Sequence, residues 1–123
     1  MNPVSAMTGA TSSQVLDDDL VRHFCTRVMG EAKEIGAYLG IVIDQEPDDR
    51  HGVTRKLGSF KTSMLQDVEH GRVLELQALV GAVIELGAIT GTPVPTIEAI
   101  HAVTALLGHT LASQHGRLRI DAA

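Results

Sequence analysis

A dense group of polar side chains lies between Lys61 and Glu75 of this chain. It holds a small hydroxyl, an amide, carboxylates and cations within about four helical turns, directly before an apolar run. A hydroxyl such as that of Ser63, next to free backbone N–H groups at the start of a helix, is suited to binding a carboxylate. An ionised carboxylate such as Glu75 accepts hydrogen bonds from hydroxyl groups but has no proton to donate. A plain structural helix needs no such density of hydrogen-bonding groups, so this stretch is a candidate binding site.

Structural roles are open for the same residues. Ser63 is a good helix N-cap, and Gln66 three residues later would complete a capping box. Glu75 reads by default as a solvated helix charge, although its apolar neighbours predict a central, partly buried helix. The other charged residues of the stretch are expected to form a solvated face with local ion pairs: Asp67, Glu69, His70 and Arg72.

Other reactive side chains give weaker signals. Glu98 and His101 lie three residues apart on one predicted helix face, but a di-metal bundle site needs two such pairs and two further glutamates. Only Asp67 and His70 echo that spacing, so we expect no metal site. Cys25 is the only cysteine and lies beside an apolar helix face, so we expect it to be an inert core residue.

The composition excludes several classes of protein. The 123 residues suffice for one domain, and 44% of them are hydrophobic, which predicts a folded chain. A formal charge of −5 argues against binding nucleic acid through its phosphate backbone. The apolar stretches are interrupted by charged residues, which argues against a membrane span. A single cysteine and the lack of a signal-peptide pattern predict a cytoplasmic protein.

The hydrophobic periodicity predicts an all-α fold of about five or six helices in one domain, 1–123, with a frayed tail over 116–123. No periodic pattern precedes residue 11. A short turn is expected over 12–16, a long helix from the Asp17–Asp19 run to Gly40, and a further helix over 48–57. Ile41–Ile43 reads as an extended linker packed on the helices. A central helix over 72–86 and a last helix capped by Thr96 complete the prediction.

The stretch from Lys61 to Arg72 resembles the hallmark of the C-terminal domain of 2-dehydropantoate 2-reductases, the ketopantoate reductases. In that family a Ser-Met-Leu-Gln-Asp run is followed by a Gly-Arg pair, a glutamate, and an apolar helix that ends in Gly-x-Pro. The chain has these pieces in order, and the segment Asn2–Gly9 resembles the one that follows the family's catalytic lysine helix. The resemblance covers residues 2–107: Ser63–Asp67, Gly71-Arg72, Glu75, Leu76–Leu86 and Gly91-Thr92-Pro93.

This resemblance implies a domain of an NADPH-dependent enzyme that reduces ketopantoate to pantoate, in pantothenate and coenzyme A biosynthesis. It implies that Ser63 and Asn2 bind the substrate, a small 2-keto acid, and that Glu75 contacts the nicotinamide ribose region of the cofactor. It also implies a compact helical bundle similar to the C-terminal domain of 6-phosphogluconate dehydrogenase, without a Rossmann domain.

Two parts of the family's machinery are not found in this sequence. The family's general acid is a lysine about two helical turns before the Asn-Pro pair, whereas the chain begins one residue before Asn2. No G-x-G-x-x-G dinucleotide fingerprint occurs. We therefore expect no catalytic residue and no bound cofactor in this chain alone, and no activity without a Rossmann-domain partner in trans. The alternative is a non-enzymatic helical oligomerisation module. In either case we expect a homo-oligomer, most simply a dimer, because a face that packs on a Rossmann domain is apolar.

Overall fold

The computed structural model describes residues 1–115, and the predicted frayed tail over 116–123 lies outside the described residues. Between residues 1 and 115 the chain forms seven α-helices and one π-helical turn, with no strand, which confirms the all-α prediction. The elements in chain order are α1 (Asn2–Thr8), α2 (Ser12–Asp17), α3 (Asp19–Tyr38), α4 (Pro47–Lys56), α5 (Ser63–Glu69), η1 (Gln77–Gly81), α6 (Ala82–Thr90) and α7 (Pro95–Ser113).

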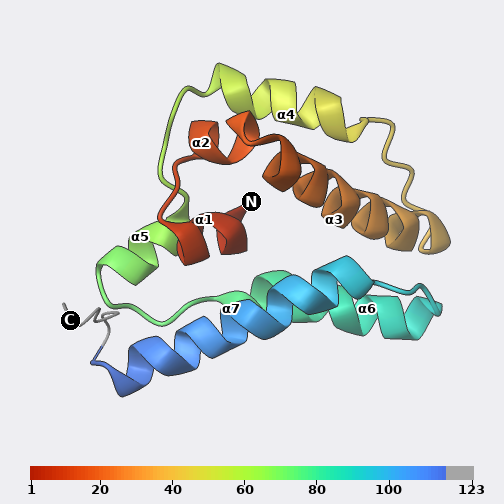
Figure 1. The fold of residues 1–123 in the computed structure, drawn as a ribbon. Coiled ribbons are helices and arrows are strands. Elements are labelled where there is room, and N and C mark those ends of the chain that lie inside the picture. The colour runs from red at the N-terminus through yellow and green to blue at the C-terminus, as the bar shows by residue number, and fades with distance from the viewer. Residues whose placement is uncertain (116–123) are drawn as a thin grey trace.

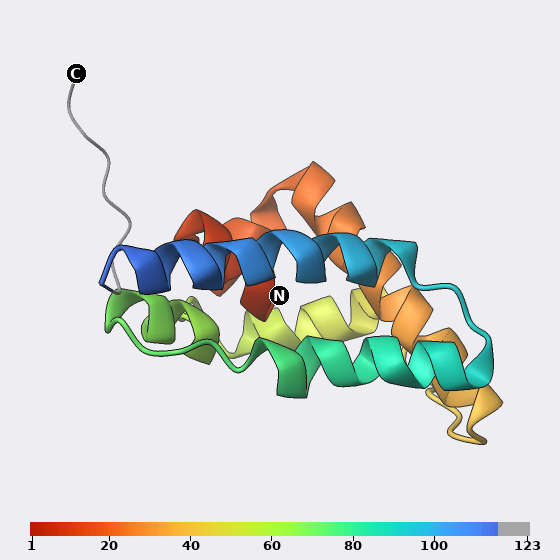
Figure 2. The same cartoon turned by 90° about the horizontal axis from the view of Figure 1, so that it is seen from below.

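The helices form layers around α3 (Figure 1). Helix α4 packs on α2 and α3, and α3 in turn packs on α6 and α7. Helix α1 packs against α5, α7 and α2, so it joins the two sides of the molecule near one end. Seen from below, α7 runs along the domain, and η1 and α6 follow one side of it over part of its length (Figure 2). Of these two, η1 contacts α7. No helix within residues 1–115 is both long enough and apolar enough to cross a membrane.

Several helix ends follow the predicted signals. The carboxylate of Asp18 accepts a hydrogen bond from the backbone N–H of Val21 at 2.9 Å, so it caps the start of α3. Gly40 adopts a φ of 79° just beyond α3, in the left-handed region that favours glycine, and this ends the helix as predicted. Helix α2 begins with a complete capping box between Thr11 and Gln14.

The sequence shows no periodic pattern before residue 11, but the structure has a helix there, α1, over residues 2–8. Pro3 lies in the first turn, where its missing N–H costs nothing, and Gly9 ends the helix with a φ of 74°. These two signals are present in the sequence, but the segment is too short to show an apolar period. The linker Ile41–Ile43 is not sheet, as predicted. Ile41 and Ile43 lie against Gly36 of α3, as predicted, although the side chains of the linker remain exposed.

The predicted central helix over 72–86 was also wrong in two respects. Residues 72–75 are not helical, and the segment begins with η1, a π-helical turn, before α6. The apolar side chains of the segment are divided between core and surface, since Val80, Val83 and Ile84 pack against a buried cluster. Val73 and Leu79, by contrast, are 91% and 48% exposed. Gly81 gives room for the Gln77 side chain, because a Cβ at residue 81 would collide with the Gln77 amide.

The core includes two clusters of buried residues, which α3 joins at different points along its length. One contains Val4, Val15, Cys25 and Ile100, which confirms that Cys25 is a buried core residue. The other contains Ile35, Val94 and Ile97, with side chains of η1 and α6 packed against it. The two clusters therefore anchor the first two turns of α7 to α3.

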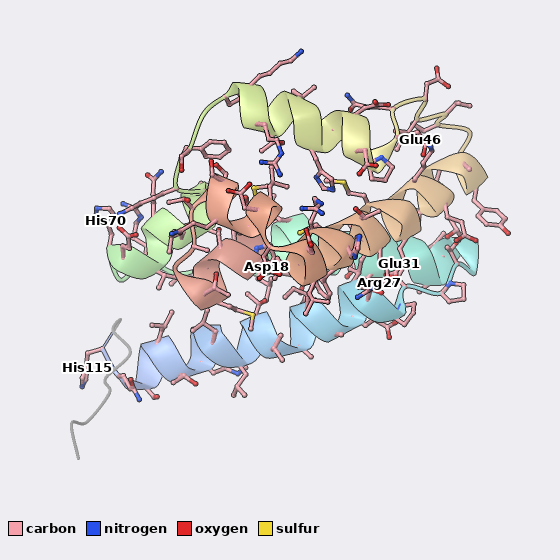
Figure 3. The ribbon with its side chains drawn as sticks, turned by 45° about the horizontal axis from the view of Figure 1, so that its top comes forward. Asp18, Arg27, Glu31, Glu46, His70 and His115 are labelled. Atoms are coloured by element: carbon pink, nitrogen blue, oxygen red, sulfur yellow. The ribbon has the colours of Figure 1, made fainter. Side chains whose placement is uncertain are left out.

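Glu31 of α3 caps the start of α7. Its two carboxylate oxygens accept hydrogen bonds from the backbone N–H groups of Thr96 and Ile97, at 3.0 and 2.9 Å (Figure 3). The N-cap position itself is Val94, whose side chain makes no capping bond, so the predicted cap by Thr96 was wrong. A carboxylate at a helix N-terminus also interacts favourably with the helix dipole. Glu31 therefore ties the first turn of α7 to the middle of α3.

Replacement of Glu31 tests this contact. Glu31→Gln should lower the free energy of unfolding by about 1–2 kcal/mol, because a charged cap on two N–H groups is lost. Urea denaturation measures the loss. Glu34→Gln on the exposed face of the same helix is the matched control and should change stability by less than about 0.5 kcal/mol. Equal effects of the two substitutions would contradict the capping role.

His51 is a buried polar residue between α4 and α3, with a side chain only 3% exposed. The Thr26 hydroxyl donates to the Arg22 carbonyl oxygen, so it accepts a bond from His51 Nε2–H across 3.1 Å. This leaves His51 Nδ1 as a buried atom with no partner among the described residues. Burial lowers the pKa of His51 below its ordinary value of 6.5, and the cations Arg22 and Arg55 and the N-terminus add to this, while Asp48 opposes it.

The lowered pKa predicts acid sensitivity. Below about pH 6.5 the unfolded chain binds a proton on this imidazole and the folded chain does not, so the free energy of unfolding should fall as the pH drops from 7 to 5. Above pH 7 His51 adds no further pH dependence to the free energy of unfolding. Urea denaturation at several pH values should show a shallower decline for His51→Gln. His23→Gln, on the exposed face of α3, should keep the slope of the natural chain.

Candidate functional site

The candidate site is built around the start of α5, where Thr62 rather than Ser63 is the N-cap. The Thr62 backbone is extended, and its hydroxyl accepts a hydrogen bond from the Leu65 N–H at 3.2 Å. The predicted cap by Ser63 was therefore wrong. Gln66 does not complete a capping box either, because its amide donates to the Lys61 carbonyl oxygen at 3.1 Å. Ser63 is the first helical residue, and its side chain is exposed.

A chain of buried hydroxyl groups joins α5 to α1. The Ser5 hydroxyl donates to the Asn2 carbonyl oxygen at 3.1 Å, and Ser5 Oγ is also hydrogen-bonded to Thr62 Oγ1. Since the hydrogen of Ser5 is used on Asn2, the Thr62 hydroxyl must donate to Ser5. Both hydroxyl-bearing residues are buried, with exposed fractions of 0% for Ser5 and 3% for Thr62. Hydrogen bonds in such a chain strengthen one another in a medium of low dielectric constant.

This chain of hydroxyl groups joins the two helices that carry Asn2 and Ser63, two of the three predicted site residues. Asn2 lies one helical turn before Ser5, and Ser63 is the residue after Thr62. The Ser5–Thr62 contact therefore holds the start of α1 beside the start of α5. Asn2 also lines an apolar cavity of about 290 Å³ between α1, α3, η1, α6 and α7, and it is the one residue with a polar side chain among those lining it.

Glu75, the third predicted residue, lies in the non-helical segment before η1 and is exposed. Its predicted place on a partly buried central helix was wrong, because Gly71 ends the α5 region with a φ of 68° and no helix resumes before residue 76. Neither Glu75 nor Ser63 lines the cavity next to Asn2. The structure thus joins Asn2 and Ser63 through a shared contact, and places Glu75 on a separate segment.

The other charged residues of the stretch are paired with one another. Asp67 and Arg72 form an ion pair at 2.9 Å, and Lys61 and Glu69 form one at 3.0 Å, which confirms the predicted local pairs. His70 Nδ1 lies 2.7 Å from the Gln66 carbonyl oxygen. These pairs occupy the surface and are worth a few tenths of a kcal/mol each.

Asn2, Ser63 and Glu75 differ from these neighbours. Within residues 1–115 none of their side chains makes a hydrogen bond or an ion pair to the rest of the chain. In a stretch where most polar groups are used internally, these three remain available to a ligand. Sequence reasoning missed Ser5 and Thr62, which position two of them. The signal for Thr62 was present, since threonine is itself a preferred N-cap residue.

Metal-ligating residues do not gather in the described part of the chain. Among residues 1–115 no group of three or more His, Cys, Asp and Glu side chains could hold a metal ion. Glu98 and His101 lie on α7, but no second pair comes to meet them.

Comparisons with known proteins agree on one family. A family model described as "Ketopantoate reductase PanE/ApbA C terminal" matches residues 1–107. The chain is similar to the 2-dehydropantoate 2-reductase of Mesorhizobium japonicum, with 43% identity over 102 residues that cover 83% of this chain and 31% of that protein.

Solved structures show the same likeness. A crystal structure from Ralstonia solanacearum MolK2, assigned to the ketopantoate reductases, matches with a TM-score of 0.85 and 48% identity, over 91% of this chain and 34% of that one. The 2-dehydropantoate 2-reductase of Methylococcus capsulatus matches with a TM-score of 0.81 and 24% identity, over 96% and 40%, which shows a shared fold. The chain spans about a third of the length of these relatives.

Two adjacent hydroxyl residues give a direct test of the site's local structure. Thr62→Ala should lower the free energy of unfolding by about 1–2 kcal/mol, because it removes the cap of α5 and leaves Ser5 without its partner. Ser63→Ala should change it by less than about 0.5 kcal/mol, since that hydroxyl has no partner in the folded chain. Urea denaturation of the two variants measures the difference. The reverse order of effects would show that Ser63 caps the helix.

Proposed function

The chain belongs to the family of the ketopantoate reductase C-terminal domain, and from this premise we propose that it forms the substrate-side wall and the dimerisation surface of an NADPH-dependent 2-keto acid reductase. The observation that carries the proposal is that the side chains of Asn2, Ser63 and Glu75 have no partner within residues 1–115, in a site otherwise rich in internal bonds. Ketopantoate is the proposed substrate, and its reduction to pantoate is the proposed reaction.

Each residue has a role that its chemistry supports. The exposed Ser63 hydroxyl donates to the carboxylate of the keto acid, and the Asn2 amide donates to a second oxygen of the same molecule. The Glu75 carboxylate accepts from ribose hydroxyls of the cofactor. The reduced nicotinamide supplies the hydride that adds to the keto carbon. None of the three residues donates the proton that the new alkoxide oxygen needs, so the general acid comes from outside this set.

The cofactor cradle is proposed to lie in a separate Rossmann-type domain, in the same polypeptide or in trans. The sequence contains no G-x-G-x-x-G fingerprint, and the chain covers 31% of its Mesorhizobium japonicum relative. A D-mandelate dehydrogenase that shares the fold, with a TM-score of 0.81 at 16% identity, was solved with NADH and anilino(oxo)acetate, which is itself a 2-oxo acid. That structure is consistent with keto acid reduction on this fold.

Dimerisation is proposed from the exposed apolar side chains of helices α6 and α7. Large aliphatic side chains on both helices are exposed, with Ile89 at 77% and Leu106 at 63%. Exposed apolar surface of this kind marks an interaction site. A ketopantoate reductase from Staphylococcus aureus that shares the fold, with a TM-score of 0.70 at 16% identity, is described as dimeric.

Reconstitution tests the catalytic part of the proposal. The chain is mixed with a Rossmann half prepared from the Mesorhizobium japonicum relative, and NADPH oxidation is followed with ketopantoate. Activity should appear only in the mixture. Ser63→Ala should raise the KM for ketopantoate by about 10- to 100-fold, because a hydrogen bond to a charged group is lost. Glu75→Gln should raise the KM for NADPH instead.

Matched controls separate this result from misfolding. Ser113→Ala and Glu85→Gln change the same residue types at exposed helix positions and should leave both KM values unchanged. Sedimentation of the chain alone at micromolar concentration should show a dimer. A dimer without any activity in the mixture would favour the alternative, a non-enzymatic oligomerisation module. A clean monomer would contradict the dimerisation surface.

A further inference from the structure

A second and larger cavity of about 470 Å³ lies between the segment 71–77 and the C-terminal half of α7. Its volume falls within the range of small-molecule binding pockets, about 300–1,000 Å³. The pocket has no role in the function proposed above. Its walls are Gly71, Arg72, Val73, Leu74, Leu76 and Gln77 on one side, and residues of α7 from His101 to Ala112 on the other.

The cavity is lined by a cationic residue, Arg72, whereas the chain as a whole is negatively charged. The protein carries 15 acidic and 10 basic residues, yet no aspartate or glutamate among residues 1–115 lines the cavity. The polar side chains that line it include Arg72, Gln77, His101 and His109, set in an otherwise mostly apolar wall. A mostly apolar pocket with a few convergent polar groups is the usual form of a ligand site. Here those groups favour an anion.

Arg72 is the permanent charge of the pocket. Its Nε donates to Asp67 at 2.9 Å, which holds the guanidinium in place, and its side chain is 57% exposed. Asp67 is the one carboxylate bonded to it among the described residues, and the terminal nitrogens of the guanidinium make no bond there. A guanidinium with both terminal NH2 groups free matches the geometry of a ligand carboxylate.

Helix α7 gives the pocket an open apolar floor. Ala105, Gly108 and Ala112 follow one another at helical spacing and all line the cavity. A Cβ placed on Gly108 would meet no atom within 4 Å, so the space above this glycine is empty of protein. The floor therefore accepts a compact apolar group against small side chains.

The pocket is separate from the candidate reductase site. Asn2 lines the other cavity, and Ser63 and Glu75 line neither. Glu75 lies between Leu74 and Leu76 in the sequence, but it is not part of the lining. A ligand in this pocket is thus recognised by a different set of residues.

We propose that this cavity is a binding site for a small carboxylate with a compact apolar body. Arg72 pairs with the carboxylate, and the apolar body lies on α7 over Ala105 and Gly108. The site is independent of the reductase function, since it needs neither a Rossmann domain nor a cofactor.

A pair of probes tests the proposal on the full chain. Cyclohexanecarboxylate and its neutral analogue cyclohexanecarboxamide are titrated against the protein by NMR, where millimolar affinity is expected for ligands of about nine non-hydrogen atoms. The acid should bind about tenfold more tightly than the amide, because only the acid pairs with Arg72. Arg72→Gln should abolish that difference. Arg50→Gln, which removes an exposed arginine on α4, should preserve it.

A second pair of variants tests the location. Gly108→Leu fills the pocket and should abolish binding of both probes, while Gly30→Leu should not. A Cβ at Gly30 of α3 also meets no atom within 4 Å, so both variants are expected to fold, and circular dichroism checks this. Ser63→Ala should leave binding unchanged.

Four results would overturn the proposal. These are no binding of either probe, equal binding of acid and amide, retained binding in Gly108→Leu, or weakening by Ser63→Ala as large as that by Arg72→Gln. The last result would place the carboxylate in the candidate reductase site. Because the readout is binding and not catalysis, a failed reconstitution of reductase activity does not affect this test.

Discussion

The bond between the hydroxyls of Ser5 and Thr62 is the contact on which the candidate site depends. It is buried, and it connects the first turn of α1 to the first turn of α5, 57 residues later in the chain. Thr62 caps α5 with the same oxygen, so one hydroxyl both starts the helix and fixes its neighbour. The candidate ligand groups Asn2 and Ser63 flank this bond. Their side chains can remain free for a ligand because Ser5 and Thr62 make the bonds that hold α1 and α5 together.

Glu31 makes a second long-range contact that fixes the start of a helix, here α7. Its carboxylate replaces a local cap at the start of α7, and this fixes the helix that forms one wall of both cavities. Large apolar side chains remain exposed on α6 and α7, among them Ile89 and Leu106. A chain that spans about a third of its relatives' length is expected to bury such a surface against other protein.

The sequence predicted the family, the all-α class and the long helices, because periodicity and end signals such as Asp18 and Gly40 are local. The predictions from the sequence failed where a contact between residues far apart in the chain determines the local structure. Glu31 caps α7 from 65 residues away, which no window along the chain reveals. Ser63 and Thr62 are both good capping residues, and only the contact with Ser5 selects between them. The apolar run over 76–86 predicted a covering neighbour, but periodicity does not tell whether that neighbour lies within residues 1–115.

A double-mutant cycle between Ser5→Ala and Thr62→Val measures the central contact directly. If the two hydroxyls form one bonded unit, Ser5→Ala strands the buried Thr62 hydroxyl, and Thr62→Val removes the bond that Ser5 Oγ accepts. The double replacement removes both partners together. The losses in free energy of unfolding should then be non-additive by about 1–2 kcal/mol, with the double variant more stable than the sum predicts. Additive losses, within about 0.3 kcal/mol, would show that the two residues act independently and would contradict the account of the site given above.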